Sequence, residues 1–295
     1  MQLIFARLLL RLLALLPLKL LHAMAVPAGW LAWRLPWRKH MAIETNLKLC
    51  FPEMKSEQRR RLHRRHLVEM MRLLLESGAV WYWSKQRLFR HVVSVEGWSL
   101  VEQQLQKGRG VLLVGAHFGN WEILPLFVSA RAPFVALYKA PKRADLDAAV
   151  TASRSRFGAK LISSGSPAMR GMLAALRRGE AIGLLADQQP KQGDGVFAPF
   201  FGQPALTMTL VNRLSRKTDT PVIFAAAERV AGRGWAIRFE AADERITAAD
   251  PVEAIAPMHE WLESTIARHP EQYLWSYKRF SVRPTGEPDL YPRRR

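Results

Sequence analysis

The sequence predicts an α/β fold in which a sheet is sandwiched between helices, and two observations support this prediction. From about residue 90 onward, short apolar runs typical of buried strands alternate with stretches of helical spacing. Polar residues capable of chemistry stand directly after two of these runs, and functional groups of α/β proteins gather at one edge of the sheet. With 295 residues, the chain is long enough for one large or two modest domains with a buried core.

Each expected element follows from its local pattern of apolar residues. The expected strands are residues 92–95, 111–114, 134–137, 160–162, 181–185 and 222–227. The expected helices are residues 55–80, 98–106, 120–130, 146–157, 167–178 and 207–217. Such alternation is typical of helices packed on both faces of a sheet. Ser56 is expected to cap the helix of residues 55–80, whose basic first half is either a solvated face or a docking surface for phospholipid headgroups or acidic partners.

The N-terminal segment differs from the rest of the chain. Residues 1–39 are strongly apolar, with six Lys or Arg, no acidic residue and three tryptophans. No stretch supplies the roughly 18 to 20 uncharged apolar residues of a membrane span. A helix lying in the membrane interface suits the pattern better, although a span stays open if Arg7 and Arg11 snorkel to one face. We therefore expect a membrane-associated helix in residues 1–40 and a second domain in residues 41–295.

The charge of the chain limits its partners. The 44 Lys and Arg against 25 Asp and Glu give a net charge of +19 and a pI near 10.9. Nucleic acid, anionic lipid headgroups and an acidic carrier protein all fit this sign. The basic tail at residues 293–295 is expected to be solvated or to touch headgroups.

Several classes of site have no support in the sequence. The single Cys50 excludes an intramolecular disulfide framework. His63 and His66 have no companion ligands at metal-binding spacing, so no metal is expected. The motifs of serine hydrolases and of the common nucleotide cradles are missing from the sequence, and no cofactor is expected.

Residues 111–122, V-L-L-V-G-A-H-F-G-N-W-E, predict a strand, a tight turn and a helix. The apolar run stops at His117, Gly119 gives a permissive backbone, and Asn120 is a good helix cap. Glu122 is expected in the first turn of the helix. Because the tight turn lies between them, the side chains of His117 and Glu122 can then meet. A neutral imidazole held by a carboxylate is a general base, so His117 and Glu122 are candidate catalytic residues. The alternative is a half-buried turn histidine beside an ordinary N-terminal helical Glu.

A second polar group follows another strand. Asp187 and Gln188 come directly after the run of residues 181–185, as His117 follows its own strand. All three side chains are therefore expected at the same edge of the sheet. The alternative for Asp187 and Gln188 is a simple structural turn.

Five motifs in order resemble one known family. They are N-L-K-L-C-F-P (46–52), H-F-G-N-W-E (117–122), R-F-G (156–158), A-D-Q (186–188) and P-F-F-G-Q-P-A (199–205). The chain resembles the late acyltransferases of lipid A biosynthesis, the lauroyl and myristoyl transferase family within the H-x4-D/E glycerolipid acyltransferase superfamily. The motifs cover most of the chain from about residue 40 to about residue 280.

The resemblance implies a mixed sheet sandwiched by helices, an N-terminal membrane anchor and a place on the cytoplasmic face of the cell inner membrane. It implies transfer of a fatty acyl chain from acyl carrier protein to a hydroxyl of an anionic glycolipid, a lipid A precursor of the Kdo2-lipid IVA type. His117 would take the proton of the acceptor hydroxyl, and Glu122 would fix the tautomer of the imidazole. No acyl-enzyme is needed, because the acceptor itself is the nucleophile.

Of the remaining roles, the resemblance points only to that of Arg156, and for either Arg156 or its neighbour Arg154 the alternative is an ordinary surface residue near a helix end. Arg156 matches an active-site arginine, and Arg154 is an alternative equivalent. Donors for the oxyanion are Arg156 or backbone N–H groups at residues 118–120, including Asn120. Asp187 and Gln188 would position the acceptor, while Phe200 and Phe201 either wall an acyl groove or belong to the core.

Two other functions compete with this interpretation. One is the same chemistry on another hydroxylated lipid, such as a phosphoinositol mannoside or an amino-acid lipid. The other is a basic, non-catalytic protein that binds nucleic acid or anionic membranes. The apolar N-terminus and the lack of aromatic RNA-binding motifs disfavour nucleic acid as a partner.

Overall fold

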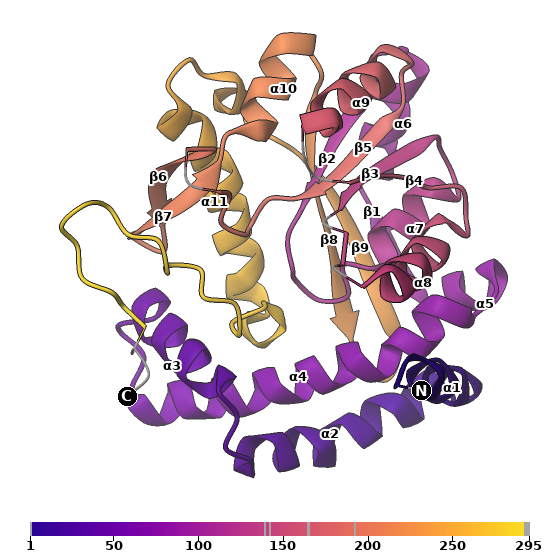
Figure 1. The fold of residues 1–295 in the computed structure, drawn as a ribbon, viewed down its shortest axis with the longest axis vertical. Coiled ribbons are helices and arrows are strands. Elements are labelled where there is room, and N and C mark those ends of the chain that lie inside the picture. Colours follow the sequence, from indigo (N-terminus) through magenta and orange to yellow (C-terminus); the bar gives the residue numbers. More distant parts are fainter. Residues whose placement is uncertain (1, 139, 142, 164–165, 192, 292–295) are drawn as a thin grey trace.

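The computed structural model describes residues 2–138, 140–141, 143–163, 166–191 and 193–291. Within them a seven-stranded sheet has the order β1-β9-β8-β2-β5-β3-β4 (Figure 1). Its strands are β1 (Val92–Glu96), β2 (Val111–Gly115), β3 (Phe134–Tyr138), β4 (Lys160–Ser163), β5 (Ala181–Leu185), β8 (Val222–Val230) and β9 (Gly234–Ala241). Neighbouring strands are parallel except for the antiparallel pair β8 and β9. The expected mixed sheet is therefore confirmed, and it is mostly parallel. The basic tail at residues 293–295 lies outside the described residues.

Helices cover both faces of this sheet (Figure 1). They are α1 (Gln2–Leu15), α2 (Leu18–Arg34), α3 (Lys39–Cys50), α4 (Ser56–Tyr82), α5 (Lys85–Phe89), α6 (Trp98–Gln106), α7 (Ile123–Ser129), α8 (Ala144–Ser155), α9 (Ser166–Arg177), α10 (Leu210–Thr218) and α11 (Pro251–Arg268). Two short 3-10 helices, η1 (Glu244–Thr247) and η2 (Pro270–Gln272), and a separate hairpin of β6 (Gly195–Phe200) and β7 (Gln203–Met208) complete the fold.

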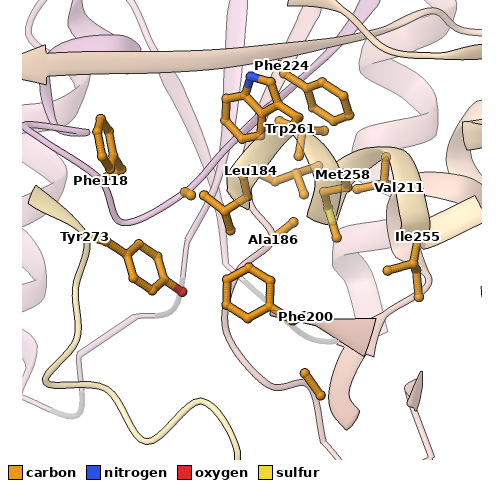
Figure 2. Packing of buried hydrophobic residues seen from close by; sticks show 14 of the residues in the cluster. Phe118, Leu184, Ala186, Phe200, Val211, Phe224, Ile255, Met258, Trp261 and Tyr273 are labelled. Atoms are coloured by element: carbon orange, nitrogen blue, oxygen red, sulfur yellow. The ribbon is translucent and has the colours of Figure 1, made fainter. Parts of the chain in front are cut away.

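The alternation of side chains along β2 divides the core into two clusters. Leu112 and Val114 join one cluster with residues of α9, α10 and α11, while Val111 and Leu113 join the other with residues of α6 and α7. This is the period of two that a strand buried on both faces requires. In the first cluster, Phe224 stacks on Trp261 with ring centroids 4.8 Å apart (Figure 2). Both faces of the sheet are thus covered by apolar side chains, and the polar residues gather at its edge.

The carboxyl ends of the central strands β8, β2 and β5 point toward the long helix α4, which crosses that edge of the sheet (Figure 1). Helices α1 and α2 pack on α4 from the other side. The approach of α2 is close, since a Cβ atom at Gly29 would lie 2.7 Å from Cα of Val68. Helix α4 is therefore the layer between the N-terminal helices and the polar edge of the sheet.

The N-terminal segment is two helices rather than the expected one. The helical conformation is interrupted between Leu15 and Leu18, where Pro17, the N-cap residue of α2, has an extended backbone. No helix among the described residues is both long and apolar enough to cross a membrane. Membrane association of residues 1–40, and the boundary of a second domain at residue 41, stay predictions.

Some elements differ from the sequence expectations. Strands β6, β7 and β9 and helix α11 were not expected, and Thr207 lies in β7 rather than at the start of a helix. Ser56 does not cap α4; the backbone N–H of Lys55 instead donates to the Gln58 side chain at 2.9 Å. These differences leave the polar edge of the sheet where the strand pattern placed it.

Candidate active site

The centre of the site is a buried pair of side chains from two neighbouring strands. In the register of β2 and β5, Gly115 faces Leu185, so His117 and Asp187 come two residues beyond paired strand ends. Nδ1 of His117 donates to Oδ1 of Asp187 at 2.8 Å, and the backbone N–H of His117 donates to Oδ2 at 3.0 Å. Their expected meeting at one edge is confirmed. Asp187, not Glu122, holds the imidazole, which corrects the pairing expected from the sequence.

These contacts set the protonation of the imidazole. Burial lowers the pKa of His117, but the charge and hydrogen bond of Asp187, with a smaller effect of Glu122, raise it further than burial lowers it. The pKa of His117 is therefore above 6.5. Because a carboxylate only accepts hydrogen bonds, the neutral imidazole carries its proton on Nδ1 and presents a lone pair on Nε2.

Gln188 lies at that lone pair. Its side-chain amide nitrogen is 3.3 Å from Nε2 of His117, so its N–H groups can donate there. The contact of Gln188 is thus with the basic nitrogen itself, a contact that was not predicted from the sequence. A hydroxyl that uses this base must take the place of Gln188.

Glu122 has a different partner from the one expected. Arg154, in the last turn of α8, donates to Glu122 from Nε at 2.9 Å and also from Nη2. Both charges are close enough to the imidazole to affect the pKa of His117, Glu122 raising it and Arg154 lowering it. Arg154 is therefore the arginine of the site.

Arg156 does not reach this group. Its Nη1 donates to the carbonyl oxygen of Trp83 at 2.6 Å, and its guanidinium lies over the ring of Phe157, 4.4 Å from the centroid. Burial lowers the pKa of Arg156 to about 10. Of the two arginines, Arg154 lies beside Glu122 and Arg156 does not, because residues two positions apart on a helix differ by roughly 200° in direction.

The backbone of the turn is not available as an oxyanion hole, contrary to expectation. The N–H groups of Phe118, Gly119 and Asn120 donate to the carbonyl oxygens of Ala116, Gln272 and Ala227. Gly119 is required here, since its φ is +59° and a Cβ atom would lie 2.0 Å from the oxygen of Ala227. The Asn120 side chain neither caps α7 nor faces the site; it donates to Glu76 at 2.7 Å.

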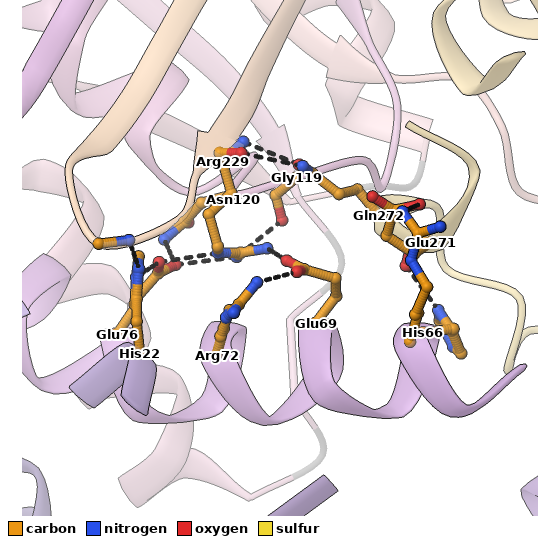
Figure 3. Close-up of polar contacts among 12 residues, drawn as sticks. His22, His66, Glu69, Arg72, Glu76, Gly119, Asn120, Arg229, Glu271 and Gln272 are labelled. Carbon is orange, nitrogen blue, oxygen red and sulfur yellow. Dashed lines mark hydrogen bonds and ion pairs between the residues drawn. The ribbon is translucent and has the colours of Figure 1, made fainter. Parts of the chain in front are cut away.

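A buried ionic network holds this turn from below (Figure 3). Arg229, near the end of β8, donates to Glu76 at 2.7 and 2.8 Å and to Glu69 at 2.9 Å. Its Nη2 also donates to the carbonyl oxygen of Gly119 at 3.2 Å. Burial raises the pKa of Glu76, but the charge of Arg229 outweighs it and the pKa falls to about 2. The network therefore stays ionised and fixes the backbone two residues from His117.

This network was not predicted from the sequence, although the sequence contains one signal for it. Glu69 and Glu76 are seven residues apart among apolar residues of α4, so they share one face of the helix. Acidic residues on a buried face require a cationic partner. The network also includes His22 of α2, which binds Glu76.

An apolar cavity opens beside the site. It lies between one sheet face and α7, and its lining is Leu113, Gly115, Trp121, Glu122, Leu124, Pro125, Val128, Phe134, Ala136, Leu137, Arg154, Gly183, Leu184, Leu185 and Ala225. Glu122 and Arg154 are its charged members, and Trp121 both lines it and contacts the ring of His117, with centroids 4.9 Å apart. One end of the cavity is therefore beside His117.

Phe200 and Phe201 are not part of this cavity. Phe200 is 1% exposed and packs edge-on against Tyr273 and Phe201 (Figure 2). Of the two roles weighed for this aromatic pair, the structure supports a place in the core.

An apolar cavity that ends beside a carboxylate-held imidazole suits an enzyme that acts on a long apolar chain. Comparison with known proteins places the chain more narrowly. It belongs to the bacterial lipid A biosynthesis acyltransferase family, whose family model matches residues 3–281. The membership expected from the five motifs is thus confirmed.

Individual relatives agree with this family. Lipid A biosynthesis palmitoleoyltransferase of Escherichia coli (strain K12) is 30% identical over 255 residues, which cover 86% of this chain and 82% of that protein. Lipid A biosynthesis lauroyltransferase of the same organism is 28% identical over 278 residues, 94% of this chain and 90% of that protein. A lipid A biosynthesis acyltransferase of Haemophilus influenzae is also 28% identical, with 94% and 89% coverage.

Proposed function

We propose that this protein moves a fatty acyl chain from acyl carrier protein to a hydroxyl of a lipid A precursor of the Kdo2-lipid IVA type. The observation that carries the proposal is the apolar cavity whose one end is formed by Trp121, beside His117. The cavity would hold the acyl chain and leave its thioester carbonyl near the base. The family of the chain supports the same reaction.

The mechanism follows from the donors and acceptors at the site. Nε2 of His117 takes the proton of the acceptor hydroxyl as its oxygen attacks the thioester carbonyl carbon. The imidazolium that forms is stabilised by Asp187, which already holds Nδ1 at 2.8 Å. When the tetrahedral intermediate collapses, the C–S bond breaks and the imidazolium returns the proton to the departing thiolate. No covalent enzyme intermediate is required.

Arg154 is the donor we assign to the oxyanion. Glu122 accepts from Nε and Nη2 and so orients the guanidinium, while Nη1 can donate to the negative oxygen of the intermediate. Oriented donors of this kind are often the largest contribution to catalysis. Glu122 thus acts through Arg154 in this mechanism. Asp187 acts on the imidazole rather than on the acceptor.

Membrane association at the cytoplasmic face of the inner membrane is part of the proposal. Helices α1 and α2 expose many large apolar side chains, and Leu15, Phe5 and Leu31 are 72%, 69% and 61% exposed. We propose that these helices lie in the interface, where an apolar helix face is stable. The acceptor, itself an anionic membrane glycolipid, would then lie in the same membrane surface as α1 and α2.

The test is acyl transfer by the purified, detergent-solubilised protein. The donor is an acyl carrier protein thioester and the acceptor a tetra-acylated, phosphorylated lipid A precursor. We expect His117→Ala to lower the rate by about 100- to 10,000-fold. His269→Ala, in a half-exposed histidine of another region, should keep the wild-type rate. Equal rates in wild type and His117→Ala contradict the assigned base. A well-folded wild type without transfer to this acceptor points instead to another hydroxylated membrane lipid.

A further inference from the structure

A groove lies on the outer side of the helical layer, where α2 crosses α4. It is lined by Gly29, Trp30, Trp33, Arg64, Arg65 and Val68. The groove is distinct from the active site, because Glu69 and Glu76 point from the inner side of α4 toward the sheet (Figure 3).

Cations gather around one aromatic ring of this groove. The guanidinium carbons of Arg60 and Arg64 lie 5.6 and 5.5 Å from the ring centroid of Trp33. Nε of Arg64 is buried and has no hydrogen-bond partner among the described residues. Such cations keep part of their donor capacity for a ligand.

Nearby carboxylates compensate this charge only in part. Glu57 pairs with Arg61 at 3.2 Å and lies 3.6 Å from Arg64, while Glu271 pairs with Arg65 at 2.8 Å. Across residues 55–66, six Lys or Arg stand against one acidic residue. The groove therefore has a positive potential that favours an anion.

The neighbouring surface of α2 is apolar. The side chains of Met24, Val26, Trp30, Leu31 and Leu35 are between 40% and 61% exposed. Trp30, at the border, forms part of the groove and has the guanidinium of Arg34 5.0 Å from its ring centroid. Tryptophan and arginine side by side are typical of the headgroup level of a membrane.

We propose that this groove binds the phosphate of an anionic membrane phospholipid, as a second lipid site separate from the catalytic one. Arg60 and Arg64 would donate to the phosphate oxygens, and Trp33 would form the floor of the site. A lipid fits better than nucleic acid because the adjoining surface is apolar. The inference rests on the proposed seating of α1 and α2 in the membrane interface.

The test compares vesicle binding of the full-length protein and two charge-matched variants. The vesicles are phosphatidylcholine alone or phosphatidylcholine with a minority of phosphatidylglycerol. Arg60→Gln with Arg64→Gln should weaken binding to the anionic vesicles by about 30-fold and leave binding to the neutral ones unchanged. Arg213→Gln with Arg216→Gln removes the same charge from the exposed face of α10, far from the groove, and should change neither. Trp30→Ala should weaken binding to both kinds of vesicle, because it removes apolar contact.

Three results overturn the inference. The first is that the variant changed at Arg60 and Arg64 binds anionic vesicles with the same affinity as the wild-type protein. The second is an equal loss in both double variants, which indicates diffuse charge. The third is that the groove variant loses as much affinity for neutral vesicles as for anionic ones, which indicates misfolding. Acyl transfer to a detergent-dispersed acceptor is measured in parallel and should not change in the groove variant. The inference and the proposed reaction can therefore fail independently.

Discussion

Glu122 and Arg154 form a two-pronged ion pair across 32 residues of sequence, from the N-cap position of α7 to the last turn of α8. The pair lies at the mouth of the apolar cavity, and both charges act on His117. Glu122 therefore pairs with Arg154, and Asp187 accepts the hydrogen bond of the His117 imidazole. This division of roles between two carboxylates can be tested residue by residue.

Asp187→Asn should change the pH dependence of transfer. His117 acts as a base only when neutral, so kcat/KM falls as the pH drops through its raised pKa, above 6.5. Removing the negative charge of Asp187 lowers that pKa, so the acidic limb should move to lower pH while the maximal rate decreases. The measurement is kcat/KM against pH, with Asp243→Asn, in an exposed pair with Arg245, as control. An unmoved limb contradicts the role of Asp187.

Arg154→Lys should lower kcat by about 100- to 1,000-fold, the usual effect of losing one oxyanion donor. A lysine cannot keep both hydrogen bonds to Glu122 and still donate to substrate. Arg156→Lys is the matched control and should have little effect on kcat, because that side chain binds Trp83 outside the site. In a double-mutant cycle, the effects of Arg154→Lys and Glu122→Gln on kcat should be strongly non-additive. Additive effects would mean that the two residues act independently.

Phe134→Leu should shift the enzyme toward longer acyl donors. Phe134 begins β3, so its ring lies at the end of the cavity far from His117, and it packs over Gly183, where a Cβ atom would meet the ring at 2.4 Å. Each additional methylene that the shortened side chain admits should favour the longer donor by about fourfold in kcat/KM.

The control is Phe224→Leu, the same change in the cluster on the opposite sheet face. It should cost stability without altering the order of donors. A similar shift in both variants would mean that the preference follows general loosening of the core, and not the length of the cavity.

Arg229→Met should destabilise the fold by about 3–5 kcal/mol, because it leaves Glu69 and Glu76 buried without their cation. The measurement is urea unfolding in detergent near neutral pH. Arg245→Met, whose partners Asp243 and Glu260 are exposed, should cost far less stability. Equal costs for the two variants would contradict a special role of the buried network.

Acid should remove part of the same stabilisation. The folded-state pKa of Glu76, about 2, is below its ordinary value of 4.5. The stabilisation from this group is complete above pH 4.5 and is lost as the pH falls toward 2. Wild type should therefore lose stability in this window, and Glu76→Gln should lose less of its remaining stability there.

The sequence predicted the scaffold better than the contacts of the site. Strands such as β2 and β5 are continuous apolar runs, and their ends placed His117 and Asp187 at one edge. The hydrogen bond between them depends on the register Gly115 to Leu185, which one sequence does not contain. Local spacing favoured Glu122 as the partner of His117, because the long-range pairing was unknown. The choice between Arg154 and Arg156 similarly depends on the direction in which the end of α8 points.

The sequence also contains signals for other elements that were not predicted. The run of β9, G-W-A-I-R-F-E-A, follows β8 after a short Gly-containing turn, the usual signal of a hairpin. Helix α11 begins at Asp250-Pro251, and the Asp250 side chain accepts from the N–H of Val252 at 3.0 Å. The partner of the two α4 carboxylates was not readable, because Arg229 lies 153 residues beyond Glu76.

The turn that carries His117 is bonded to β8 on one side and to the segment after η2 on the other. Gly119 forms a bridge with Ala227, Phe118 forms one with Tyr273, and the N–H of Leu274 donates to the carbonyl oxygen of His117 at 3.0 Å. These amides should exchange with deuterium as slowly as those of the central strands, although they belong to a connection. The same bonds make the length of this connection invariable, whereas the turn at Gly286, where an added Cβ atom would meet open space, should accept inserted residues.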